Sequence, residues 1–135
     1  MSASPDGRSL LPDAARPLFR RRHRLRSSKR IRETYSQGHR QVGQTMVMWV
    51  RHAADSRCRL AVVASKKVGP AVQRNRAKRR IREVFRLHRH LLCPNVDLVI
   101  VCRYTTGRVD WNLLSEEFIT LARRSGVLLA EAEAK

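Results

Sequence analysis

The sequence predicts one α+β domain, with helices packed around a single central sheet. Its 135 residues suit one domain, and 42% of them are hydrophobic, so the chain can bury a core. Short runs of β-branched and apolar residues are typical of strands, whereas apolar residues spaced three and four apart are typical of helices. In chain order these patterns predict a helix, strands, a strongly basic helix, a further strand and a last helix.

The two ends of the chain are predicted to lie outside this domain. Residues 1–18 contain three prolines and a glycine and no apolar period, so we expect a flexible N-terminal arm. The domain itself is predicted over residues 19–130, and residues 131–135 form a short C-terminal tail.

The first helix is predicted to begin inside a basic run and to continue beyond it. The run covers residues 20–32 and contains eight Lys or Arg residues and no acid. Ser27 or Ser28 can cap this helix, because a serine hydroxyl accepts a hydrogen bond from a backbone N–H of the first turn. The helix is expected to continue to Ser36, with Gly38 as its stop signal.

Three segments have strand character. Residues 45–51 (TMVMWVR) and 59–65 (RLAVVAS) are rich in β-branched and apolar residues, and residues 52–58 between them could form a hairpin connection. Residues 96–104 (VDLVIVCRY) give the clearest pattern, a near-continuous apolar run typical of a central strand. The last helix is predicted to begin at Asp110 or Asn112 and to end at Gly126. Its apolar stripe consists of Trp111, Leu114, Phe118, Leu121 and Ala122.

The basic helix is predicted to begin near Pro70, because Gly69-Pro70 is a turn signal and proline is tolerated in a first helical turn. At about 100° per residue, one side of the helix is apolar and an adjacent arc is cationic. The apolar side consists of Ala77, Ile81, Val84, Phe85 and Leu92. The adjacent arc consists of Asn75, Lys78, Arg79, Arg82, Arg86 and Arg89.

Charge is the property that points to a partner. Ten Lys or Arg residues lie between Lys66 and Arg89 with a single acid, Glu83, and the whole chain has a net charge of +18. Like charges three and four residues apart repel each other on a helix, and a solvated face normally interleaves acids with its bases. We therefore expect a polyanion against this face, with arginine forks binding phosphate oxygens in pairs.

Several classes of protein are disfavoured by what the sequence lacks. No apolar run approaches the roughly 18 residues of a membrane span, and the N-terminus lacks the apolar stretch of a secretory signal. The three cysteines are an odd number without a CxxC pair, which suits reduced thiols in the cytoplasm. The acids are scattered and His88, His90 and Cys93 lack a fourth ligand at a standard spacing, so we expect no catalytic site and no metal bound by the protein.

The basic segment resembles the signature of the bacterial ribonuclease P protein component. The matching residues are Ser65-Lys66-Lys67, Gly69, Ala71-Val72, Arg74-Asn75-Arg76, Lys78-Arg79, Ile81-Arg82 and Phe85. Weaker similarity extends over residues 24–129. The resemblance implies a ribosomal protein S5 domain 2-like fold, in which the basic helix makes a left-handed crossover between two strands.

The resemblance also implies a function. Ribonuclease P removes the 5′ leader from precursor tRNA, with its RNA subunit as the Mg²⁺-dependent catalyst, and the small protein binds the leader and stabilises the active RNA. The partners implied are therefore the ribonuclease P RNA subunit and the precursor tRNA leader. No membrane is expected as a partner, and no protein partner is inferred. The residues that would bind RNA are Lys66, Lys67, Arg74, Asn75, Arg76, Lys78, Arg79, Arg82 and Arg86.

A cleft between the first helix and the sheet would take the leader, with Ile31, Tyr35 and Trp49 at the matching positions. Aromatic rings there offer faces on which unpaired bases stack at about 1–3 kcal/mol per base. Ile31 stands where the family usually has Phe, so only apolar contact is expected at that position. Tyr35 and Trp49 could equally be ordinary core residues.

Three other functions are compatible with the basic composition alone. A structural RNA-binding protein of the ribosomal type is equally small and basic. A DNA-binding protein is disfavoured because it would need a paired recognition helix, and a membrane-surface protein is disfavoured because it would need the apolar side of the basic helix that the core uses.

Overall fold

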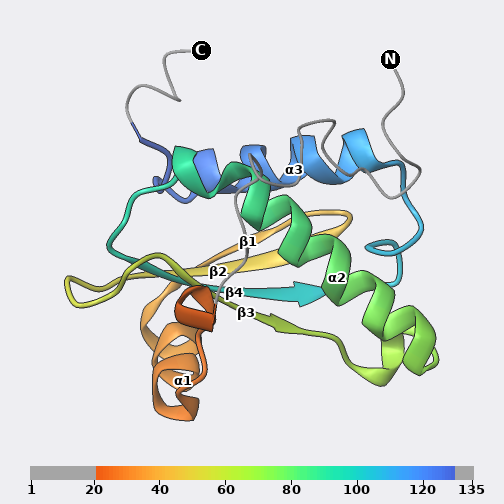
Figure 1. Ribbon diagram of the computed structural model, residues 1–135, viewed down its shortest axis with the longest axis horizontal. Helices are drawn as coiled ribbons and strands as arrows, with labels where there is room; N and C mark the ends of the chain where they lie inside the picture. The colour runs from red at the N-terminus through yellow and green to blue at the C-terminus, as the bar shows by residue number, and fades with distance from the viewer. Residues whose placement is uncertain (1–20, 130–135) are drawn as a thin grey trace.

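The central sheet has helices on both of its faces (Figure 1). The computed structural model describes residues 21–129, so the predicted arm and the predicted tail lie outside the described residues. Within this range the sheet has four strands, β1 (His39–Val42), β2 (Met46–His52), β3 (Arg59–Val63) and β4 (Val96–Cys102). The α-helices of the same range are α1 (Ser28–Gln37), α2 (Ala71–His88) and α3 (Trp111–Arg124), with short 3₁₀ turns η2 (Arg21–His23), η3 (Lys66–Val68) and η4 (Arg89–Leu91). This is the α+β order that the sequence predicts, with one strand added.

The strand order is β1-β2-β4-β3, so β4 lies between β2 and β3. β4 pairs antiparallel with β2 and parallel with β3, and α2 forms the crossover between the parallel strands. The predicted hairpin between residues 45–51 and 59–65 is therefore wrong. The physical reason is that β4 is apolar on both faces and takes the central position, which separates the two strands that are neighbours in sequence.

The edge strand β1 is absent from the sequence-based prediction. Its residues, HRQV, are mostly polar and exposed, so they lack the apolar alternation by which a strand is recognised. β1 exists because it pairs antiparallel with β2 across a short turn.

α1 begins and ends where the sequence predicts, but its end has an unexpected cause. Ser27 is the N-cap, and its hydroxyl accepts a hydrogen bond from the N–H of Arg30 at 3.2 Å. Gly38 follows the helix with a φ of −85°, so it is not the left-handed glycine of a common helix end. A Cβ at Gly38 would lie 2.4 Å from the carbonyl oxygen of Thr34 and 2.5 Å from that of Val50, so only glycine lets the chain pass this close to β2.

The main core lies between the sheet and the pair α2 and α3, both on the same face of the sheet (Figure 1). The five residues of the predicted apolar stripe of α2 and its continuation are all buried, namely Ala77, Ile81, Val84, Phe85 and Leu92. α3 contributes Leu114, Phe118, Leu121 and Ala122 as predicted, while Trp111 is half-buried. Asp110 caps α3 by accepting a hydrogen bond from the N–H of Asn112 at 3.0 Å.

A second, smaller cluster lies on the opposite face of the sheet, under α1. It consists of the buried Leu25, Ala61 and Val99 with the partly buried Ile31, Tyr35, Trp49 and Val63. The two faces of one sheet therefore carry two different surfaces, one beside α2 and one beside α1. None of the helices within residues 21–129 is both long and apolar enough to cross a membrane.

Candidate nucleic-acid interface

The cationic surface of α2 forms a shallow hollow. Its volume is about 430 Å³, and it is lined by Arg24, Asn75, Lys78, Arg79, Arg82 and Glu83. Burial lowers the pKa of Arg82, and the positive charge of Arg24 lowers it further, so cations are held here against their mutual repulsion. A polyanion placed in this hollow would relieve that repulsion.

Arg24 is the member of this hollow that the sequence did not single out. The adjacent Leu25 is buried, and its N–H donates to the carbonyl oxygen of Leu60 in β3 at 2.9 Å, so the chain before α1 runs beside β3 and brings Arg24 to α2. The basic run over residues 20–32 was a signal for such a contact, but it could not say which of its cations face α2.

Two of the predicted RNA-binding residues have their side chains hydrogen-bonded to backbone carbonyls of the protein. Arg76 is exposed and donates through Nε to the carbonyl oxygen of Gly107 at 2.8 Å. Arg74 is half-buried and donates to the carbonyl oxygen of Gly69 at 3.1 Å. The same flank of α2 includes Arg80, which is 4% exposed and bonds the carbonyl groups of Thr106 and Val109, a structural role.

The expectation that Arg86 belongs to the same surface is wrong. Its side chain is 8% exposed, and its Nε donates to Oε1 of Glu83 at 3.0 Å. Arg89 is similarly engaged, because its guanidinium donates to the carbonyl oxygens of Arg57 and Cys58. A helical wheel places both residues on the cationic arc, but it does not show that Glu83 pairs with Arg86 or that the segment containing Arg57 and Cys58 binds Arg89.

Lys66 and Lys67 extend the cationic surface beyond the N-terminus of α2. Both are exposed in η3, and the hydroxyl of Ser65 accepts a hydrogen bond from the N–H of Lys67 at 3.3 Å. Gly69 then turns the chain into α2 with a φ of +138°, a conformation that glycine tolerates far better than other residues.

The predicted cleft residues come together on the other face of the sheet. The rings of Tyr35 and Trp49 meet edge to face with their centroids 5.1 Å apart, and the guanidinium carbon of Arg40 lies 5.8 Å from the centroid of Trp49. Ile31 packs against the same cluster, and all three predicted residues are half-buried. The rings thus pack on the sheet and still keep surface in contact with solvent.

α1 is held over this face by a buried ionic cluster centred on Asp97. The Asp97 carboxylate is 0% exposed, and its Oδ2 lies 3.0 Å from Nε of Arg30 on α1 and 3.3 Å from Nη2 of Arg51 on β2. Ser56 donates to its other oxygen, and the exposed Asp55 bonds Arg30 from outside. Asp97 therefore links α1 to the sheet and helps to hold Ile31 and Tyr35 of α1 beside Trp49, a role that no pattern in the sequence indicated.

Comparison with known proteins identifies this arrangement. A sequence profile of the family Ribonuclease P matches residues 19–126. The ribonuclease P protein component of Natranaerobius thermophilus is 30% identical over 104 residues, which cover 77% of this chain and 90% of that protein. The chain belongs to the ribonuclease P protein family.

Solved structures of this family agree with the fold. The ribonuclease P protein of Thermotoga maritima gives a TM-score of 0.67 at 28% identity and covers 75% of this chain and 96% of that one. The Staphylococcus aureus protein gives 0.70 at 23% identity and covers 79% of this chain and 98% of that one. As a ribonuclease P protein, the chain is a non-catalytic subunit of a holoenzyme that processes precursor tRNA, and its partners are the ribonuclease P RNA and the tRNA substrate. The ribosomal, DNA-binding and membrane-surface alternatives are set aside by this membership.

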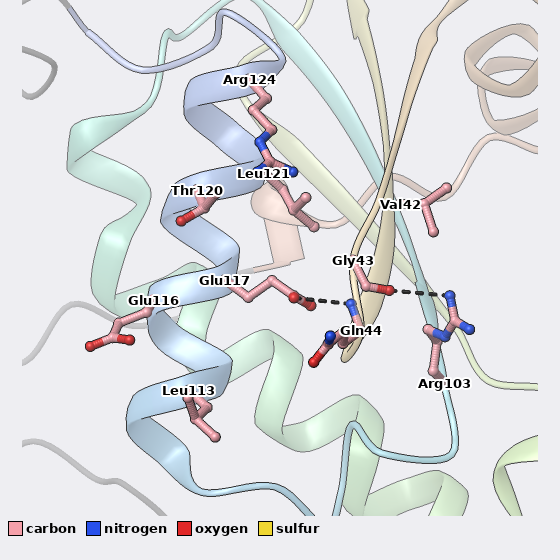
Figure 2. Close-up of a pocket in the computed structure, with 10 residues that line it drawn as sticks. All are labelled: Val42, Gly43, Gln44, Arg103, Leu113, Glu116, Glu117, Thr120, Leu121 and Arg124. Atoms are coloured by element: carbon pink, nitrogen blue, oxygen red, sulfur yellow. Dashed lines mark hydrogen bonds between the residues drawn. The ribbon is translucent and has the colours of Figure 1, made fainter.

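A second hollow in this ribonuclease P protein has a different character. Figure 2 shows it between the β1–β2 turn and α3, with a volume of about 610 Å³. Glu117 accepts a hydrogen bond from the N–H of Gln44, and Arg103 donates to the carbonyl oxygen of Gly43 (Figure 2). Glu117 also accepts from the N–H of Thr45. Burial would raise the pKa of Glu117, but these bonds and one from the Thr45 hydroxyl outweigh it and hold the pKa below its usual range. Because both carboxylates and guanidinium groups line it, this hollow lacks the predominantly positive charge of the α2 surface.

The residues that might bind a metal do not gather into a site. Within residues 21–129 no group of three or more His, Cys, Asp or Glu side chains is placed to hold an ion. His88 is turned to the protein instead, with Nδ1 at 2.8 Å from the carbonyl oxygen of Val84, and burial lowers its pKa.

Proposed function

We propose that this chain binds the ribonuclease P RNA through the α2 surface and the 5′ leader of precursor tRNA through the cleft beside α1. The observation that carries the first assignment is the hollow in which Arg24, Lys78, Arg79 and Arg82 converge with a single acid among its lining residues. Arginine-rich surfaces of this kind bind phosphates and release counterions from the nucleic acid.

The second assignment rests on the half-buried pair Tyr35 and Trp49. Their rings lie on the face of the sheet opposite α2, beside Arg40, so a single strand could place bases on the rings and a phosphate on the guanidinium. Stacking is largely independent of base identity, which suits a protein that must accept many leaders. Because the α2 surface and the cleft beside α1 lie on opposite faces of the sheet, one small protein could contact the RNA subunit and the leader at the same time.

The Mg²⁺ ions of the reaction are proposed to be held by the RNA subunit. Within residues 21–129 the donor set does not fit a metal site, because the buried or half-buried carboxylates are already paired. Asp97 is bonded by Arg30 and Arg51, Glu83 by Arg86 and Glu117 by backbone N–H groups, and Glu33 lies 4.0 Å from Arg51. No step of the cleavage is therefore assigned to a protein-bound ion. The cytoplasm is the proposed place of action, where the free thiols of Cys58, Cys93 and Cys102 remain reduced.

Salt dependence of RNA-subunit binding tests the α2 surface. Each phosphate contact contributes about one unit to the slope of log affinity against log salt concentration. Arg79→Ala and Arg82→Ala should each flatten this slope by about one unit. Arg123→Ala on the exposed side of α3 removes the same charge elsewhere and should leave the slope unchanged. Equal slopes for all three variants and the unmodified protein would remove α2 from the interface.

Comparison of precursor and mature tRNA tests the cleft. Trp49→Leu should weaken holoenzyme binding to precursor tRNA by about 5- to 150-fold, the range for one stacked base, and leave mature tRNA binding nearly unchanged. Trp111→Leu makes the same substitution on α3 and should not alter the ratio of the two affinities. Equal losses for both tRNAs would assign Trp49 to packing alone.

A further inference from the structure

The loop that follows β4 presents an exposed aromatic ring beside the start of α2. Among the Phe, Tyr and Trp side chains of residues 21–129, Tyr104 alone is more than half exposed, at 58%. The other aromatic rings of this range are buried in the core or half-buried in the clusters described above. A ring left this exposed gains little from burial, so its position invites a functional explanation.

The ring of Tyr104 is already stacked on one side. The guanidinium carbon of Arg108 lies 3.7 Å from the ring centroid, a cation–π contact. Nη1 of Arg108 donates to the carbonyl oxygens of Tyr104 at 2.6 Å and of Val68 at 3.2 Å. These bonds hold the guanidinium in place, so the pair is ordered before any ligand arrives and little side-chain entropy remains to be lost.

Arg108 also connects the ring to the cationic surface of α2. Val68, whose carbonyl it bonds, directly follows the exposed Lys66 and Lys67 in η3. Within the described part of the chain, no carboxylate lies within ion-pair distance of these two lysines or of Arg108. An exposed π-face and three positive charges therefore adjoin one another at this end of the helix.

We propose that Tyr104 and Arg108 form a stacking site for an unpaired base of the ribonuclease P RNA subunit, with Lys66 and Lys67 on the neighbouring phosphates. The inference rests on the proposed α2 interface and extends it around the N-terminus of the helix. Bases stack on tyrosine rings and on guanidinium planes, and lysines bind phosphates as point charges. The RNA subunit is the favoured partner because Arg108 is anchored to η3, next to α2, whereas the rings of the proposed leader cleft pack with α1 on the other face of the sheet.

A substitution series at Tyr104 tests the proposal in the full chain. The measurement is the affinity for fluorescently labelled ribonuclease P RNA at several salt concentrations. Tyr104→Phe and Tyr104→Trp keep an aromatic face and should bind within about twofold of the unmodified protein or tighter, whereas Tyr104→Leu keeps an apolar side chain under Arg108 and should bind about 5- to 150-fold more weakly. Because tyrosine is uncharged, the salt slope of Tyr104→Leu should equal that of the unmodified protein, while Lys67→Ala should flatten it by about one unit.

Three results would overturn the proposal. The first is an unchanged affinity of Tyr104→Leu for the RNA subunit. The second is a loss seen with precursor tRNA and not with the RNA subunit, which would move the site to the substrate. The third is a flattened salt slope for Tyr104→Leu, which would mean that the ring only holds the lysine-bearing turn in place. If α2 did not bind the RNA subunit at all, Arg79→Ala and Arg82→Ala would leave the salt slope of RNA-subunit binding unchanged, so that outcome is distinguishable from the three above.

Discussion

Asp97→Asn is the substitution that should most clearly measure how much the contact between α1 and the sheet contributes to the stability of the fold. Asparagine has the size of aspartate but no charge, so it leaves the guanidinium groups of Arg30 and Arg51 without their shared anion. The carboxylate is 0% exposed, and Nη2 of Arg30 lies 2.8 Å from its Oδ2 while Nη2 of Arg51 lies 3.3 Å away. The variant should therefore lose stability mainly through α1 and β2.

The size of the loss follows from the burial of the three partners. Removing one member of a buried ion pair typically lowers the free energy of unfolding by about 3–5 kcal/mol. The side chains of Arg30 and Arg51 are 17% and 16% exposed, so both can turn toward water in the variant, which favours the lower end of that range. A loss of about 3 kcal/mol corresponds to a fall of roughly 12 °C in Tm for a domain of this size.

Urea unfolding followed by circular dichroism measures this change, provided that the slope with urea concentration stays constant. The matched control is Asp55→Asn, which removes the other carboxylate bound to Arg30 at an exposed position and should shift the midpoint much less. Equal midpoints for the two variants would refute the reasoning. Because α1 contributes Ile31 and Tyr35 to the proposed cleft, Asp97→Asn should also reduce discrimination between precursor and mature tRNA more than it reduces affinity for the RNA subunit.

Further predictions concern a carboxylate, a glycine and the thiols. The pKa of Glu117 lies below its ordinary value of 4.5, so the carboxylate contributes stability that is present above that pH and is lost as the pH falls through the lower folded-state pKa. Acid titration of unfolding should therefore show Glu117→Gln less stable at neutral pH and converging with the unmodified protein in acid, whereas parallel curves would contradict this assignment. Gly38→Ala should lower the unfolding free energy by about 1–3 kcal/mol, since its Cβ would meet two backbone carbonyls, and an unchanged urea midpoint would show that the chain yields there. Burial raises the pKa of Cys58 to about 11 and of Cys102 to about 12, so a thiol reagent at pH 8 should label the half-buried Cys93 first, and equal labelling rates in the folded protein would be inconsistent with this packing.

The helices were predictable because their signals are local. A capping serine at Ser27, an apolar stripe through Ile81 and Phe85 and a capping carboxylate at Asp110 each act within a few residues of themselves, so sequence spacing describes them well. The order of the strands is different, because it depends on which segments meet after long separations in the chain. That is why residues 96–104 could be predicted as a central strand, while the hairpin expected between residues 45–51 and 59–65 was wrong.

In the candidate site, too, features set by local sequence could be predicted, and features set by distant segments could not. The cationic face of α2 follows from helical geometry, and Arg79 and Arg82 line a hollow there. Arg24 was not singled out because it reaches α2 through the pairing of its segment with β3. Arg86 was assigned to the RNA-binding set although Glu83, one turn earlier on the same helix, pairs with it. The buried Asp97 could not be found either, since a lone acid in an apolar strand carries no sign of the two arginines that meet it in space.

The central position of β4 has a consequence for synthesis on the ribosome. β1 and β2 can pair as soon as they emerge, but β3 has no neighbour in the sheet until β4 follows it, and the α2 segment is made between the two. Until residue 102 has left the exit tunnel, the apolar stripe of α2 has no completed sheet to cover and stays in contact with water. The nascent chain therefore displays the cations of α2 before it has a folded sheet on which to arrange them, and selective RNA recognition must wait for the last strand.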